Sequence, residues 1–121
     1  MREAQRVAEE KLAFVGLADL VSLPAANLTL AMRKRLELAK ALAMNPKLLF
    51  LDEVNAGLNS AEVEQAMALI RQIADSGVTI VLIEHLMKVV LAVSSRVVVL
   101  HNGALIADGS PADVVADPQV V

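Results

Sequence analysis

Two pairs of ionisable residues follow apolar runs in this sequence. Asp52 and Glu53 directly follow the run Leu-Leu-Phe-Leu, and Glu84 and His85 directly follow Val-Thr-Ile-Val-Leu-Ile. Short apolar runs of this kind are typical of strands that are buried on both faces of a parallel sheet. Open α/β sheets bind ligands at the carboxyl ends of their strands. The two pairs therefore predict a site for a charged ligand, with phosphate and a metal ion as the first candidates.

Each of these side chains suits one part of such a site. Asp52 can hold Mg²⁺ through water, because this ion keeps much of its hydration shell in proteins. Glu53 can orient or deprotonate an attacking water molecule. His85 can donate a hydrogen bond to a phosphoryl oxygen. The alternative is that the two carboxylates only cap a loop or a helix and that His85 is structural.

The composition restricts the class of protein. The chain has 121 residues, which is one domain or part of one, and its hydrophobic fraction of 56% is high for that length. This excess indicates apolar surface for a partner or for a missing piece of the same fold. A net charge of −3 and only two aromatic residues, Phe14 and Phe50, argue against a nucleic-acid surface. The absence of cysteine excludes disulfides and fits a reducing cytoplasm.

The surrounding elements alternate between helices and strands. A helix is expected from Thr29 to about residue 44, where Asn45-Pro46 ends it. Asn59, with Glu62 three residues later, predicts a capped helix start between the two strands. The remaining elements expected are a helix at 2–15, strands at 48–51 and 78–83, a helix at 86–94, a hairpin over 97–107 turning at Asn102-Gly103, and a helix after Ser110-Pro111.

This order of segments resembles the C-terminal half of the nucleotide-binding subunit of ATP-binding cassette (ABC) transporters. The motifs that carry the resemblance are Leu-Leu-Phe-Leu-Asp-Glu, Ala-Gly-Leu-Asn and Leu-Ile-Glu-His. Leu-Ile-Glu-His-Leu-Met-Lys-Val-Val is most similar to importer ATPases for branched-chain amino acids. The resemblance implies an α/β, partial P-loop NTPase-like three-layer fold that lacks the Walker A half. Residues 1–45 would then end a helical subdomain with the signature helix, and residues 46–121 would be the remainder of a RecA-like core.

The resemblance also implies a role for individual residues. Asp52 becomes the magnesium-associated carboxylate, Glu53 the general base and His85 the γ-phosphate sensor. Thr29 stands at the position of the signature serine and would contact nucleotide held by the opposite subunit. Asn59 stands at the position of the aspartate in the loop after the catalytic glutamate, near the dimer interface.

Several residues depart from the family pattern. The two signature glycines are Leu30 and Ala31, which restricts a close approach of the backbone to phosphate. The signature glutamine is Met32, the proline after the catalytic glutamate is Val54, and an acidic residue is replaced by Leu86. The basic run 33–35 is either a phosphate patch or, in the interpretation that we favour, a solvated helix face.

The half of the site that holds ATP is not found in this sequence. None of its five lysines follows a glycine, so there is no Gly-Lys-Ser/Thr loop to hold phosphate. ATP and Mg²⁺ are therefore expected only together with the missing N-terminal half or a partner subunit, and the chain alone is expected to be inactive. We also expect marginal solubility or self-association, because the incomplete sheet would expose apolar faces and strand edges.

The function implied by the resemblance is ATP hydrolysis coupled to uptake by an ABC importer. The implied partners are a second ATPase subunit in a head-to-tail dimer and transmembrane permease subunits, with no nucleic acid. The implied location is cytoplasmic, on the inner face of the cell membrane. A first alternative is a non-catalytic fragment that pairs with intact nucleotide-binding subunits. A second is a phosphoacceptor domain using Asp52, although no earlier strand carries the acidic pair expected there.

Overall fold

The computed structural model describes residues 2–120, and these residues form two compact units, Met1–Ile83 and Glu84–Val121. The elements of the first unit are α1 (Arg2–Phe14), η1 (Ala18–Leu20), η2 (Ala25–Asn27), α2 (Leu30–Ala43), β1 (Leu48–Asp52), α3 (Ser60–Asp75) and β2 (Thr79–Ile83). Those of the second unit are α4 (Met87–Val93), β3 (Val97–His101), β4 (Ala104–Gly109) and α5 (Pro111–Ala116). The division between a helical part and a core at residue 45 stays a prediction.

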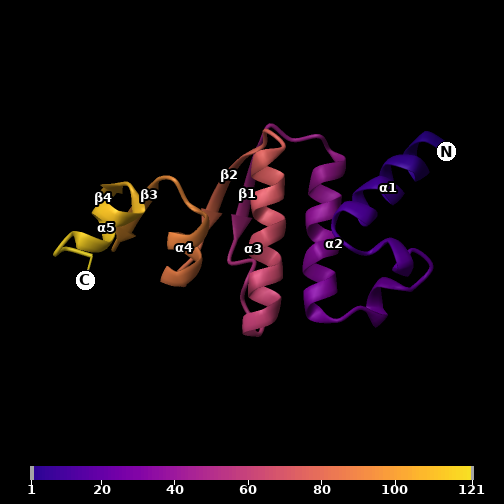
Figure 1. The fold of residues 1–121 in the computed structure, drawn as a ribbon, viewed down its shortest axis with the longest axis horizontal. Coiled ribbons are helices and arrows are strands. Elements are labelled where there is room, and N and C mark those ends of the chain that lie inside the picture. The colour runs from indigo at the N-terminus through magenta and orange to yellow at the C-terminus, as the bar shows by residue number, and fades with distance from the viewer. Residues whose placement is uncertain (1, 121) are drawn as a thin grey trace. The chain divides into compact units, whose positions relative to one another are not determined.

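A strand–helix–strand motif organises the first unit. β1 and β2 pair in parallel, with Leu48 opposite Thr79 and Asp52 opposite Ile83, and α3 connects them. α3 lies beside the strand pair and α2 beside α3, as Figure 1 shows. The core is built from apolar residues of these elements and of the segment after α1: Val15, Leu17, Leu38, Ala39, Leu42, Leu49, Leu51, Leu69, Ile70 and Ile73. The α/β class and the parallel strand pair expected from the sequence are confirmed.

Local sequence signals fix where the two long helices begin and end. Thr29 caps α2 and Asn59 caps α3 with its side chain. Asn45 adopts a φ of 56°, and Pro46 follows it, so the helical conformation cannot continue. Gly77, with a φ of 101°, follows the last turn of α3. Between these boundaries β1 and β2 pair along their whole length, so their carboxyl ends lie side by side.

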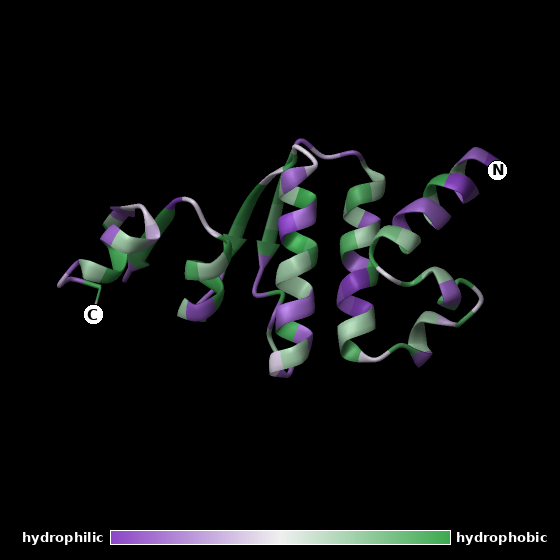
Figure 2. Ribbon diagram, in the orientation of Figure 1, coloured by the Kyte–Doolittle hydropathy of each residue, from purple (hydrophilic) through white to green (hydrophobic). Residues whose placement is uncertain are grey.

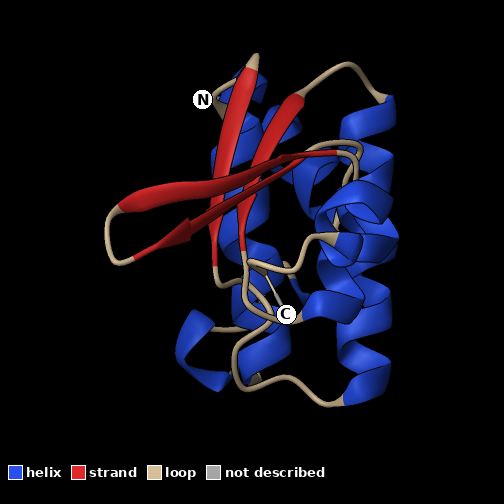
Figure 3. Cartoon of the chain, turned by 90° about the vertical axis from the view of Figure 1, so that its left-hand side faces the viewer, coloured by secondary structure: helices blue, strands red, loops and turns tan. Residues whose placement is uncertain are grey.

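The expectation that the first apolar run is buried on both faces is wrong for this chain. Leu49 and Leu51 are buried, but Leu48 is 50% exposed and Phe50 63% exposed. The reason is that α2 and α3 cover only one face of the pair, and no described residue of the first unit covers the other. Figure 2 shows both strands as strongly hydrophobic, and Figure 3 looks onto the pair with helices behind it. The exposed apolar sheet face that we expected is confirmed for the described residues.

The second unit is an antiparallel hairpin packed with short helices. β3 and β4 turn at Asn102-Gly103, whose φ angles of 49° and 79° are those of a type I′ turn. Ser110 caps α5 through a hydrogen bond from the backbone N–H of Asp113, 3.2 Å long, and Pro111 is its first residue. The hairpin and the last helix were both expected from these signals and are confirmed. None of the helices within residues 2–120 has the length and hydropathy that crossing a bilayer requires.

Candidate functional site

The end of β1 turns sharply at Glu53. This residue has a φ of 50°, in the left-handed region, and its backbone N–H donates to the carbonyl oxygen of Ile83 at 2.9 Å. Among the described residues, three that are not glycine have a positive φ, and the other two are Asn45 and Asn102. Asparagine tolerates this region well, whereas glutamate does not. Strain of this kind gathers at functional sites, and here it lies at one of the two carboxylates that the sequence singles out.

The loop that follows Glu53 is held by its own backbone. The Glu53 carbonyl accepts a hydrogen bond from Ala56 at 3.1 Å, and the Asn55 carbonyl accepts one from Leu58 at 3.2 Å. Asn55 is only 2% exposed although it is polar. No signal in the sequence marks Asn55 as buried, because asparagine in a loop is usually an exposed turn residue. The two turns carry the chain from the carboxylate pair directly into α3.

Asn59 forms a complete capping box at the start of α3. Its Oδ1 accepts from the backbone N–H of Glu62 at 2.9 Å, and the Glu62 carboxylate accepts from the backbone N–H of Asn59 at 3.0 Å. The capping role expected from the sequence is confirmed. A role for Asn59 at a dimer interface stays a prediction.

Thr29 is the N-cap residue of α2. Its Oγ1 accepts from the backbone N–H of Met32 at 3.3 Å, and the hydroxyl proton remains available as a donor. Leu30 is 46% exposed and Ala31 is half-buried, so side chains occupy the positions where the resembling family has glycine. Leu30 is in turn close to Gly57 of the loop, which links the start of α2 to the segment after the carboxylates.

The three basic residues at 33–35 differ in their exposure to solvent. Arg33 is exposed, and its Nε donates to the carbonyl of Leu28 at 3.2 Å. Lys34 and Arg35 are half-buried, and the Arg35 guanidinium donates to Gln65 of α3. The interpretation as a solvated face therefore holds for Arg33 and is wrong for Arg35, because Gln65 of α3 accepts a hydrogen bond from its guanidinium.

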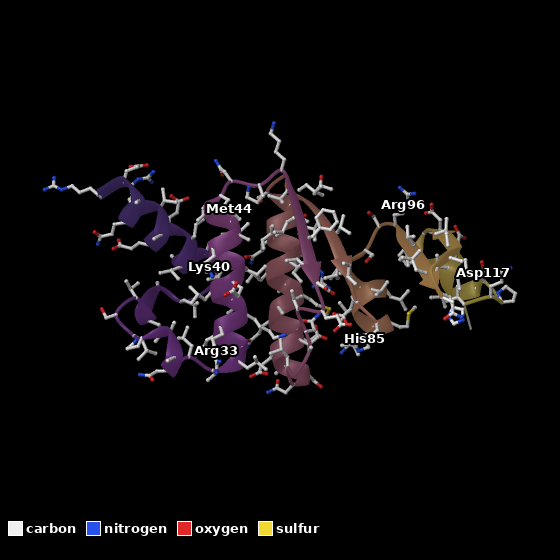
Figure 4. The ribbon with its side chains drawn as sticks, turned by 180° about the vertical axis from the view of Figure 1, so that it is seen from behind. Arg33, Lys40, Met44, His85, Arg96 and Asp117 are labelled. Atoms are coloured by element: carbon white, nitrogen blue, oxygen red, sulfur yellow. The ribbon has the colours of Figure 1, made fainter. Side chains whose placement is uncertain are left out.

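His85 lies in the second unit, on the short segment before α4. Its side chain is 69% exposed, whereas that of Glu84 is only 1% exposed. The Glu84 carboxylate accepts from the backbone N–H of His85 at 3.1 Å and of Leu86 at 3.4 Å, and it lies 3.6 Å from Nδ1 of His85. Glu84 thus orders the segment that carries the histidine, a role that the sequence analysis did not assign. Figure 4 shows the His85 side chain extending from the ribbon.

The first unit brings most of the expected residues to one end of its strands. Asp52 is the last residue of β1 and Glu53 follows it. The Leu30 side chain lies close to Gly57 in the loop after them. An open groove of about 380 Å³ runs beside β1 and is lined by both carboxylates and by Lys34 of α2. β2 ends at Ile83, opposite Asp52 in the register, and His85 follows two residues later in the chain. The approach of His85 to the carboxylates stays a prediction.

The carboxylate and histidine side chains of this chain can be compared with the ligands that Mg²⁺ requires. No group of three or more histidine or carboxylate side chains within residues 2–120 is arranged to hold a metal ion by itself. Mg²⁺ is commonly bound by one or two carboxylates together with water and substrate phosphate. The exposed pair Asp52 and Glu53 fits such a shared site, in which most ligands come from the nucleotide and solvent, and does not fit an all-protein cage.

Sequence comparison connects the chain to transport ATPases. It is 38% identical over 121 residues to the high-affinity branched-chain amino acid transport ATP-binding protein BraF of Pseudomonas aeruginosa, covering 99% of this chain and 48% of BraF. It is 36% identical over 108 residues to LivG of Escherichia coli K12, which carries the same description, covering 88% of this chain and 42% of LivG. No protein-family model matches the chain. The chain spans about half the length of the curated relatives it matches.

Solved structures give the same result. The ADP conformation of MJ1267, an ATP-binding cassette of an ABC transporter, superposes with a TM-score of 0.90 at 30% identity over 98% of this chain and 48% of that one. CbiO1 of Clostridium perfringens, part of the ABC transporter complex cbiONQ, gives a TM-score of 0.86 at 31% identity over 96% and 47% of the two chains. The expected resemblance and the P-loop NTPase fold that it implied are confirmed.

Proposed function

Since the chain belongs to the ABC transporter ATP-binding proteins and spans about half of their length, we propose that it forms the hydrolysing half of an ATPase domain that drives amino-acid uptake. The substrate class is branched-chain amino acids, by similarity to BraF and LivG. The domain works as a head-to-tail dimer with permease subunits on the inner face of the cell membrane. In this assembly ATP and Mg²⁺ bind between this chain and the parts that hold the phosphate loop.

The observation that carries the proposal is the strained backbone at Glu53. Its positive φ and its hydrogen bond to Ile83 end the strand and turn the carboxylate out at the carboxyl edge of the sheet. A general base must reach the water that it activates, and an exposed carboxylate at this edge meets that requirement. Asp52, the last residue of β1, supplies the carboxylate for the metal ion.

The other residues contribute binding and sensing in this proposal. The Thr29 hydroxyl, already fixed as an acceptor for the start of α2, donates its proton to a phosphate oxygen of nucleotide on the opposite subunit. The amino end of α2 adds its backbone N–H groups and the positive end of the helix dipole. His85, exposed on a segment ordered by Glu84, donates to the γ-phosphate. Mg²⁺, when held at Asp52, would neutralise charge on the phosphate.

The test is ATP hydrolysis by a reconstituted domain. This chain is co-expressed with the part of BraF that it does not match, which is expected to supply the phosphate loop, and magnesium-dependent phosphate release is measured. Glu53→Gln should lower the rate by about 10²–10⁴-fold, the usual contribution of a general base. Asp75→Asn, an exposed carboxylate at the end of α3, is the matched control and should leave the rate unchanged. Activity that survives Glu53→Gln removes Glu53 as the base, and a reconstituted complex without activity favours the non-catalytic alternative.

A further inference from the structure

The turn of the β3–β4 hairpin places an asparagine directly before a glycine. Asn102 and Gly103 are both exposed, and their φ angles are 49° and 79°. A Cβ atom added at Gly103 would meet nothing within 4 Å among the described residues beyond its chain neighbours. Figure 3 shows the turn as the loop that joins the two strands of the hairpin. The peptide bond between Asn102 and Gly103 is thus accessible to solvent.

An asparagine in this position can lose its side-chain amide by reaction with the backbone. The Gly103 nitrogen attacks Cγ of Asn102, the new carbon–nitrogen bond closes a succinimide ring, and the bond from Cγ to Nδ2 breaks. The N–H proton of Gly103 is released to water, and Nδ2 takes up one proton as it leaves as ammonia. Water then opens the ring at either carbonyl and gives aspartate or isoaspartate. Glycine obstructs this attack least, because it has no Cβ.

His101 lies where the departing nitrogen needs a proton. Its Nε2 is 3.2 Å from Nδ2 of Asn102. In the closed turn the unprotonated Nε2 of the neutral ring accepts the N–H of the amide. Histidine takes up a second ring proton near neutral pH, and in that form Nε2 becomes a donor that can act as a general acid. The same short distance therefore serves proton transfer to Nδ2 once Cγ has been attacked.

The attack requires the turn to open, and the hairpin is least supported at this end. Ile106 is left out of the register, as in a β-bulge, and it separates the two outer pairs, Leu100 with Leu105 and His101 with Ala104, from the rest of the ladder. All four paired residues are exposed, and none of them belongs to the buried core of the unit. Segments with few buried contacts open at low free-energy cost. The turn can therefore open while the inner part of the hairpin stays packed.

We propose that Asn102 is a site of spontaneous deamidation, with His101 as the proton donor to the leaving amide nitrogen. Aspartate is compatible with the same type of turn. Isoaspartate lengthens the backbone by one carbon and does not fit a two-residue loop, so the two outer pairs should be lost while the core remains. The inference rests on the hairpin alone and is independent of the proposed function.

Two other asparagines serve as internal controls. Asn45 has a φ of 56°, close to that of Asn102, but Pro46 follows it and has no N–H, so ring closure with loss of a proton is blocked. Asn59 precedes the small residue Ser60, but its Oδ1 accepts from the backbone N–H of Glu62 at 2.9 Å and is held in the capping box. Both should stay intact while Asn102 reacts.

The test is mass spectrometry of the 121-residue chain during incubation in neutral buffer. Cleavage after Arg96 releases a peptide of residues 97–121, in which Asn102 is the only asparagine. We expect this peptide to gain one dalton and to separate into two products, one of which elutes with the same peptide from Asn102→Asp. The peptides that contain Asn45 and Asn59 should keep their mass. Circular dichroism before incubation checks that each chain is folded.

A substitution of His101 tests the proton donor. His101→Phe keeps a planar ring without a nitrogen, and we expect deamidation of Asn102 to slow at least threefold. Equal rates in wild type and His101→Phe overturn the assignment of His101. An unchanged mass at Asn102, after a short synthetic peptide of residues 99–106 has reacted completely, overturns the site itself. Deamidation of Asn59 as fast as that of Asn102 would show that the open hairpin end has no influence, and it overturns the proposal as well.

Discussion

A methyl group placed on Gly57 would lie 2.8 Å from Cδ2 of Leu30. The loop that follows the carboxylates and the first residue of α2 are therefore in close contact. The sequence resemblance places Leu30 at a signature glycine, and its larger side chain fits because position 57 has none. The φ of 79° at Gly57 adds a second reason for glycine there. The segment that carries Glu53 is thus held against the segment that carries Thr29.

The first prediction is that Gly57→Ala destabilises the first unit more than left-handed strain alone would. That strain costs about 1–2 kcal/mol for a residue with a Cβ, and the contact with Leu30 adds to it. Gly77→Ala is the control, since Gly77 has a φ of 101° in the same unit and no neighbour within 4 Å of the added atom. Urea unfolding of the 121-residue chain measures both. Equal losses for the two variants would show that Leu30 moves aside freely.

A second substitution separates the two contributions at this position. Leu30→Ala removes the atom that meets the new methyl group, so Gly57→Ala should cost less in that background. The coupling in the double-mutant cycle is expected at about 0.5–3 kcal/mol, the range for residues in contact. An additive cycle would mean that the loop and α2 do not constrain each other.

The capping box at Asn59 gives a prediction about helix α3. Asn59→Ala removes both the acceptor for the backbone of Glu62 and the geometry of the reciprocal bond, each about 3 Å long. A loss of about 1–2 kcal/mol in the free energy of unfolding is expected. Asn59→Asp keeps the acceptor and adds a negative charge at the amino end of the helix, so it should be neutral or slightly stabilising. Thermal unfolding followed by circular dichroism measures both, and equal effects would exclude a cap.

The hydrogen bonds that the buried Glu84 carboxylate accepts lead to a prediction about amide exchange in the His85 segment. Glu84→Ala removes the acceptor of the backbone N–H groups of His85 and Leu86, so both amides should exchange with solvent faster. Glu84→Gln keeps a side-chain oxygen in place and should retain most of the protection. Hydrogen exchange resolved to these amides is the measurement. Unchanged exchange in Glu84→Ala would mean that other contacts order the segment.

Much of the fold could be predicted because its signals are local. Asn59 with Glu62, Asn102 with Gly103 and Ser110 before a proline each determine backbone geometry within a few residues. The order of strands and helices follows from apolar runs between such signals. The resemblance then assigned roles to Asp52 and Glu53 that periodicity alone does not supply.

What the sequence did not reveal depends on contacts between distant segments. The run at 48–51 has the composition of a strand covered on both faces, and only the spatial arrangement shows that Phe50 lacks a cover. The burial of Asn55 and of the Glu84 side chain depends on packing around each. The positive φ of Glu53 could not be predicted from the sequence, because turns of this kind normally use asparagine or glycine rather than glutamate.

The last prediction concerns pH and the ion pair between Arg96 and Asp108. The guanidinium donates to both carboxylate oxygens, at 2.9 and 2.7 Å, and this hydrogen bonding holds the pKa of Asp108 below its ordinary value of 3.8. As pH falls, the unfolded chain therefore binds a proton at this residue before the folded chain does. The contribution to stability is fully present above pH 3.8 and is lost as pH decreases towards the folded pKa. It should be small, because both groups are exposed.

Substitutions of Arg96 and Asp108 separate the contribution of this ion pair from the rest of the stability lost at low pH. In unfolding experiments on the second unit between pH 2 and 6, the wild-type chain should lose stability more steeply at the acid end than Asp108→Asn, which has no proton to gain. Arg96→Gln should behave similarly, because it removes the charge that lowers the pKa of Asp108.

Raised salt should reduce the difference between wild type and variants, since exposed charges are screened. The Arg6–Glu3 pair on α1 has the same exposed geometry, with an oxygen–nitrogen distance of 2.7 Å, and Glu3→Gln serves as the control for a pair outside this unit. An acid response of the hairpin that is identical in wild type and Asp108→Asn would show that the ion pair does not contribute to its stability.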